Sequence, residues 1–111
     1  MRVAERIARQ RVSPGAVAIW WLGQNSYVVK GAGAVLMIDP FFSRPGPAEK
    51  YLHDEAPLRA EELAPDAVLC THAHSDHTDP AFLCALAGRS PDTHFFGPPE
   101  SAMQIVDSGV P

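Results

Sequence analysis

The chain has 111 residues, of which 46% are hydrophobic and 20% charged, and its formal net charge is −4. This balance fits a soluble protein with one hydrophobic core and argues against a nucleic-acid-binding protein, which would be basic overall or carry a long basic stripe. We therefore expect no nucleic-acid partner. The sequence has no membrane span, so we expect no membrane partner either. The two cysteines are interpreted as buried, reduced thiols of a cytoplasmic protein.

The first part of the chain predicts a short helix followed by strands. Residues 1–12 form a helical lead-in with apolar positions on one side, and a Ser-Pro-Gly break precedes the first strand. The second and third strands are joined across a glycine-bearing connection, so we expect them to be antiparallel neighbours. The three predicted strands cover residues 17–22, 26–30 and 34–38.

The middle of the chain predicts a long loop over residues 40–57, which are rich in Pro, Gly and charge. Loops of this length in a compact domain are often functional. His53 is therefore a candidate to line a substrate mouth, and a solvated loop histidine is the alternative. A short helix is predicted over residues 59–63, before a buried strand over residues 66–71.

Three further elements are predicted downstream. Asp79 is expected to cap a helix that starts at Pro80, and Gly88 is expected to end it. A strand follows the Ser-Pro-Asp turn, and His94 on it is interpreted as an ordinary strand residue and not as a ligand. The last strand and the last, partly buried helix cover residues 93–97 and 100–107.

Four potential metal ligands lie within six residues directly after the strand over residues 66–71. His72 and His74 are two apart, so on an extended strand end their side chains leave the same face and can share one ion. Asp76 and His77 could reach a second ion if the chain turns. A purely structural zinc site is the main alternative, but such sites favour four closed ligands and are rich in cysteine.

The cluster matches the His-x-His-x-Asp-His signature, and the chain resembles the metallo-β-lactamase-fold hydrolases. Three further segments resemble the branch that contains L-ascorbate-6-phosphate lactonase. They are Trp21–Tyr27, Ile38–Phe42 and Pro98–Glu100.

The resemblance implies an α/β (α+β) fold, with this chain as the N-terminal half of a four-layer αββα sandwich. Residues 1–111 would form a single partial domain, with the helical lead-in over 1–12 and the sheet and metal loop over 17–111. Because a half-sandwich leaves one sheet face uncovered, we expect the isolated chain to aggregate or form a homo-oligomer.

The resemblance also implies a dinuclear centre. His72 and His74 would hold one divalent ion and Asp76 and His77 the other, with Zn or Mn as candidate metals and further ligands later in the chain. Asp76 would also act in catalysis by orienting the metal-bound water. Asp39 would lie beneath the metal loop and orient a ligand imidazole, although an aspartate before a proline can also simply end a strand.

The expected function is a metal-dependent hydrolase that uses a metal-activated water on a lactone, a phosphoester or a related ester. The alternative is a truncated, catalytically incompetent metal-binding fragment of such an enzyme, because the remaining ligands have no recognisable pattern in these 111 residues.

Overall fold

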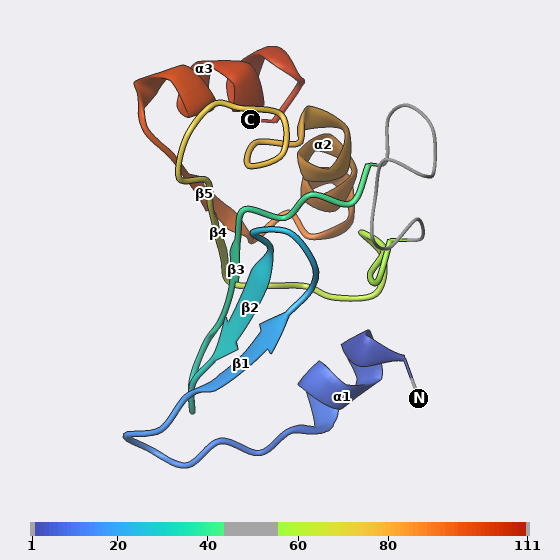
Figure 1. The fold of residues 1–111 in the computed structure, drawn as a ribbon, viewed down its shortest axis with the longest axis vertical. Helices are drawn as coiled ribbons and strands as arrows, with labels where there is room; N and C mark the ends of the chain where they lie inside the picture. Colours follow the sequence, from blue (N-terminus) through green and yellow to red (C-terminus); the bar gives the residue numbers. More distant parts are fainter. Residues whose placement is uncertain (1, 44–55, 111) are drawn as a thin grey trace.

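The computed structural model describes residues 2–43 and 56–110, so His53 lies outside the described residues (Figure 1). One mixed sheet has the strand order β1-β2-β3-β4-β5. In chain order, the elements are α1 (Val3–Arg9), β1 (Ala18–Trp21), β2 (Tyr27–Lys30), β3 (Val35–Ile38), β4 (Ala67–Leu69), α2 (Pro80–Arg89), β5 (His94–Phe96) and α3 (Pro99–Asp107). The predicted α/β class is confirmed.

The sheet changes direction of pairing at β3. β1, β2 and β3 pair antiparallel, and the backbone N–H of Gly31 donates to the carbonyl of Ala34 within the predicted hairpin connection. β3, β4 and β5 pair parallel, with Ile38 opposite Leu69. Because β3 and β4 end side by side, the residues that follow them, including Asp39 and Thr71, meet at the same edge of the sheet.

One face of the sheet carries the core. Val28, Met37 and Val68 are register partners in successive strands and are fully buried. Ile7 of α1 and Leu83 of α2 belong to the same core cluster, and Figure 1 shows both helices on this side of the sheet. The apolar side of the lead-in and the apolar stripe of α2 thus cover one face together.

The opposite face is apolar and exposed. Trp21 and Phe96 stand at the two ends of a row of register partners that crosses all five strands, and they are 57% and 55% exposed. The intervening members of the row are Tyr27, Ile38 and Leu69. A half-sandwich is expected to leave such a face uncovered. The expected self-association stays a prediction.

The structure corrects two predicted element boundaries. Residues 59–63 form a turn closed by a hydrogen bond from the Glu62 N–H to the Arg59 carbonyl, because a five-residue segment before a proline is too short to nucleate a helix. Gly88 does not end α2, which continues to Arg89. The Ser90 N–H still bonds to the Leu86 carbonyl, and one interior glycine costs a helix only about 1 kcal/mol.

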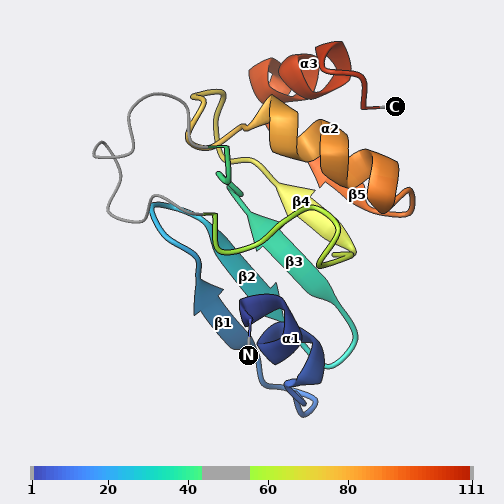
Figure 2. The same cartoon turned by 90° about the vertical axis from the view of Figure 1, so that its right-hand side faces the viewer.

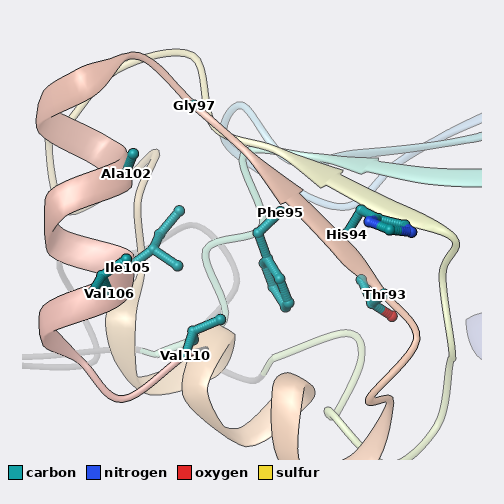
Figure 3. Close-up of a pocket in the computed structure, with 8 residues that line it drawn as sticks. All are labelled: Thr93, His94, Phe95, Gly97, Ala102, Ile105, Val106 and Val110. Atoms are coloured by element: carbon teal, nitrogen blue, oxygen red, sulfur yellow. The ribbon is translucent and has the colours of Figure 1, made fainter.

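α3 packs beside the edge strand β5 in a way that leaves part of its apolar surface open (Figure 3). Ile105 and Val110 are buried and point toward Phe95. Met103 and Val106 of the same helix are 66% and 63% exposed, so the helix is partly buried, as predicted. The helical period brings Ile105 to the covered side and turns its neighbours outward. An open groove of about 270 Å³ remains between β5 and α3.

The two cysteines differ in exposure, which corrects the prediction that both are buried. Cys70 is buried and Cys84 is exposed on α2. Burial raises the pKa of the Cys70 thiol from 9.0 to about 11. Since only the thiolate is a nucleophile, these two thiols should differ strongly in reactivity.

We expect iodoacetamide at pH 8 to label the exposed Cys84 at least about 100-fold faster than Cys70, because the raised pKa lowers the thiolate fraction of Cys70 by about 100-fold and burial restricts access to its sulfur. The raised pKa of Cys70 also makes the free energy of unfolding depend on pH. Its stabilising contribution is fully present below pH 9 and is lost as the pH rises toward 11. Peptide mass spectrometry over a labelling time course measures both rates. The two thiols should react alike in urea, and equal rates in the folded chain would contradict the burial of Cys70.

Candidate metal centre

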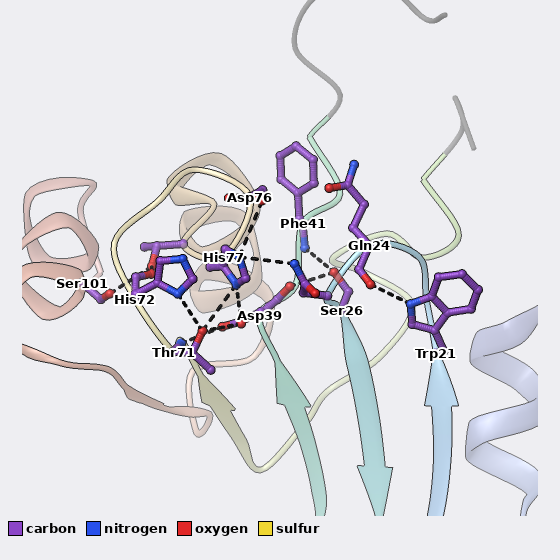
Figure 4. Close-up of polar contacts among 12 residues, drawn as sticks. Trp21, Gln24, Ser26, Asp39, Phe41, Thr71, His72, Asp76, His77 and Ser101 are labelled. Carbon is purple, nitrogen blue, oxygen red and sulfur yellow. Dashed lines mark hydrogen bonds and ion pairs between the residues drawn. The ribbon is translucent and has the colours of Figure 1, made fainter. Parts of the chain in front are cut away.

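The loop that follows β4 is folded back on itself by short-range hydrogen bonds. The backbone N–H groups of His77 and Thr78 both donate to the His74 carbonyl, at 2.9 and 2.8 Å. The Thr78 hydroxyl donates to the His72 carbonyl at 2.7 Å. These bonds turn the chain back on itself, and Figure 4 shows the side chains of His72, Asp76 and His77 near one another on this loop.

The turn brings the four predicted ligands together. The ring centroids of His72 and His74 are 4.7 Å apart, and those of His72 and His77 are 3.7 Å apart. Asp76 Oδ2 lies 3.6 Å from His77 Nε2. The strand prediction for His72 and His74 is wrong, because β4 ends at Leu69 and the following residues bend. The two rings meet through the turn and not through strand alternation.

Asp39 connects the end of β3 to this loop. Its carboxylate accepts hydrogen bonds from the Thr71 N–H and the Thr71 hydroxyl, both at 2.6 Å, and contacts His77 Nδ1 at 2.6 Å. Only 2% of Asp39 is exposed, and its φ is +46°. Aspartate tolerates this left-handed conformation better than most residues. The buried Asp39 carboxylate therefore connects the end of β3 to the loop after β4 and orients the His77 ring.

The hydrogen-bond network favours one tautomer for each of two histidine rings. With a hydrogen on Nδ1 facing Asp39, neutral His77 keeps its lone pair on Nε2. The Thr71 hydroxyl donates its only hydrogen to Asp39, so it can only accept from His72 Nδ1, which lies 3.0 Å away. Neutral His72 then also has its lone pair on Nε2. Both imidazoles would then present the same nitrogen, Nε2, to an ion.

Imidazole nitrogens beside a carboxylate are donors that zinc and manganese both accept, so the chemistry of the donor set fits a divalent ion. Within residues 2–43 and 56–110, however, no three His, Cys, Asp or Glu side chains already converge as a metal-binding group. A bound ion would therefore require rotation of these rings or further donors.

Three residues support the site that were not singled out as site residues from the sequence. The Ser26 hydroxyl donates to the Asp39 carbonyl at 2.7 Å and accepts from the Phe41 N–H at 2.9 Å, which holds the backbone on both sides of Pro40, directly after Asp39. Asn25 Nδ2 lies 3.3 Å from His77 Nε2. Thr71 joins Asp39 to both histidines. In the sequence, Thr71 adjoins the histidine cluster, and Asn25 and Ser26 lie in the segment Trp21–Tyr27, whose only signal was its resemblance to the lactonase branch.

The predicted N-cap of α2 is confirmed and extended. Asp79 Oδ1 accepts from the Phe82 N–H at 3.3 Å, as expected for a cap. Its carboxylate also accepts from the N–H groups of Phe42 and Ser43 at 3.0 and 2.8 Å, and from the Ser43 hydroxyl at 2.8 Å. Asp79 therefore connects the segment after β3 to the start of α2.

The model of the metallo-beta-lactamase superfamily matches residues 19–78, more than half of the chain, and the match includes the whole histidine loop. The chain belongs to the metallo-beta-lactamase superfamily. This match confirms the family resemblance that the His72–His77 signature indicated.

Individual relatives agree with this assignment. A metal-dependent hydrolase of Halobacterium salinarum is 36% identical, over 78% of this chain and 30% of its own length. A probable L-ascorbate-6-phosphate lactonase, UlaG, of Escherichia coli is 28% identical, over 96% and 37%. Igni18, a metallo hydrolase of Ignicoccus hospitalis with a solved structure, is 26% identical with a TM-score of 0.57, over 85% and 37%. The chain thus spans about a third of the length of the curated relatives it matches.

Proposed function

We propose that this chain carries the metal-binding part of a metal-dependent hydrolase. In it, His72 and His74 would hold one divalent ion, and Asp76 and His77 a second, with Zn or Mn as the metal. The observation that carries the proposal is the bond from His77 Nδ1 to the buried Asp39, at 2.6 Å, because a carboxylate on the far nitrogen is the usual support of a metal-bound imidazole.

Each side chain has a defined task in this proposal. The bound ions would supply an activated water and polarise the bond under attack. Asp39 and Thr71 would hold the protons of His77 and His72 on Nδ1 and leave Nε2 of each ring available to an ion. Asp76, whose side chain is 43% exposed, would orient the water. His53 remains a proposed substrate contact on the loop outside the described residues.

The proposed substrates are small lactones, phosphoesters or related esters. The lactone is supported by the similarity to the protein named as a probable L-ascorbate-6-phosphate lactonase. A fold accommodates many chemistries, so this preference rests on that similarity alone. A cytoplasmic location is part of the proposal and is supported by the two free cysteines. In the described part of the chain, no helix is long and apolar enough to span a membrane.

A second candidate is a metal-binding fragment without turnover. It is favoured by the share of the relatives that the chain covers, 30% to 37%, and by the lack of a converged group of three donors among the described residues. In this case, residues 1–111 form a partial domain of the four-layer αββα sandwich. Both candidates bind metal, and they differ in whether the bound ion hydrolyses the substrate faster than the free ion does.

The hydrolysis of three substrates by the purified chain is measured: a lactone, p-nitrophenyl acetate and p-nitrophenyl phosphate. Each assay is run with Zn²⁺, with Mn²⁺ and with EDTA. For the hydrolase, we expect metal-dependent turnover above that of the free ion and a loss of at least about 100-fold in His74→Ala, since a ligand is removed. The His94→Ala variant, on β5, should retain the activity. Metal uptake with turnover no faster than the free ion favours the fragment, and unchanged turnover in His74→Ala rejects the proposed site.

A further inference from the structure

A second candidate binding site lies at the end of α1, away from the histidine loop. Arg6, Arg9 and Arg11 line an open groove of about 440 Å³ together with Gln10 and the half-buried Trp20 of β1. Figure 2 shows α1 beside the end of the sheet where β1 begins. The groove is formed by the lead-in helix and one tryptophan, and its arginines precede the segment that the superfamily model matches, residues 19–78.

The helix that carries Arg6 and Arg9, and that Arg11 follows, is firmly held against the domain. Ala4 and Ile7 are buried in the core. Lys30 Nζ donates to the carbonyls of Ile7 and Ala8 at the helix end, at 2.6 and 3.2 Å. At the other end, the Arg2 guanidinium donates two hydrogen bonds to the Glu62 carboxylate, at 2.6 and 2.7 Å, which lowers the pKa of Glu62. The groove is therefore a preformed surface.

The charge in the groove is not neutralised. Arg2 and Lys30 are engaged as described, whereas the side chains of Arg6, Arg9 and Arg11 are exposed and form no ion pair or hydrogen bond with the residues that the structure describes. The chain as a whole carries a net charge of −4. Three unpaired guanidinium groups around a concave site produce a local positive potential that attracts anions.

We propose that this groove binds a small phosphorylated ligand with a flat ring, of the mononucleotide class. Guanidinium groups bind phosphate through paired, charge-assisted hydrogen bonds. The half-buried indole of Trp20 offers a surface on which a planar base can stack. The volume lies within the range of about 300 to 1,000 Å³ that is typical of small-molecule sites.

A membrane surface fits these observations less well. Of the apolar side chains of α1, Ala4 and Ile7 are buried and Val3 packs against the core, which leaves only Ala8 exposed. The helix therefore has no broad apolar face left to insert into lipid. A long nucleic acid would require a basic stripe beyond this one groove. Binding here requires neither the metal centre nor the hydrolase activity, so it can be tested on metal-free protein.

The test is a titration of the Trp21→Phe variant, in which Trp20 is the only tryptophan, with AMP, ADP and inorganic phosphate in EDTA at low salt. We expect ADP to quench the Trp20 fluorescence and to bind at least about fivefold more tightly than inorganic phosphate, because phosphate cannot stack. Arg9→Ala and Arg11→Ala should each weaken ADP binding by about fivefold or more. Isothermal titration calorimetry of the parent chain should give the same affinity.

The matched control is Arg89→Ala, which removes an exposed arginine from the end of α2 and changes the net charge equally. It should leave ADP binding unchanged, and circular dichroism should show that all variants are folded. An equal loss in Arg89→Ala would overturn the proposal, because binding would then depend on net charge alone. Equal affinity for ADP and phosphate, no binding at millimolar ADP, or preferential binding of anionic vesicles or of an oligonucleotide would overturn it too.

Discussion

The His72→Ala, His74→Ala double variant is expected to bind no divalent metal above background, whereas the parent chain should bind about two equivalents. The two rings are in contact, with centroids 4.7 Å apart, so the variant removes two imidazoles from the same side of the loop. The backbone bonds that fold this loop involve main-chain carbonyls, which alanine retains. Loss of metal should therefore occur without loss of the fold.

Metal content is measured by elemental analysis after incubation with Zn²⁺ or Mn²⁺ and desalting. The His94→Ala variant is the matched control, because it removes an exposed imidazole from β5 and should retain the metal. Circular dichroism confirms the fold of each variant. If the double variant binds as much metal as the parent chain, the ions are bound elsewhere and the proposed centre is wrong.

Asp39→Ala is expected to lower the free energy of unfolding by about 2 to 4 kcal/mol, since it leaves buried donors without an acceptor. The carboxylate lost here accepts from the Thr71 N–H and hydroxyl and contacts His77 Nδ1. Asp39→Asn retains the shape and one acceptor oxygen and should cost less. Both variants should weaken metal binding by about 10- to 100-fold, because the His77 ring loses the charge that orients it.

Urea unfolding of the metal-free chain measures the stability change, and competition with a chromophoric chelator measures the metal affinity. Asp92→Asn is the matched control, since Asp92 is exposed in the turn before β5 and should change neither quantity. If Asp39→Asn weakens metal binding while its stability is close to that of the parent chain, Asp39 positions the ligand. A loss of stability with unchanged metal affinity would limit Asp39 to a structural role.

Most elements of the fold follow from local sequence patterns. The hairpin of β2 and β3 follows from alternating apolar residues around a glycine-bearing connection, and Asp79-Pro80 starts α2 as predicted. Two predicted features were wrong, because they depend on helix length and on hydrogen bonding and not on residue type alone. Residues 59–63 lack the length to nucleate a helix before Pro65, and Gly88 is tolerated because the Leu86 carbonyl still has a partner in Ser90.

The donor chemistry of the candidate centre can be predicted from local sequence, because His72, His74, Asp76 and His77 are close in the chain and the donor type of each follows from its residue type. The orientation of these donors depends on contacts between distant segments. Asp39 and His77 are 38 positions apart and meet only because β3 and β4 pair in parallel and end at the same edge of the sheet.

The antiparallel pairing of β2 with β3 explains why Ser26 and Asn25 reach the site from the turn before β2. Their roles depend on hydrogen bonds between segments far apart in the sequence, which only the folded sheet brings within about 3 Å. The local sequence of a segment specifies its polar side chains. The long-range pairing of strands specifies which partners those side chains hydrogen-bond.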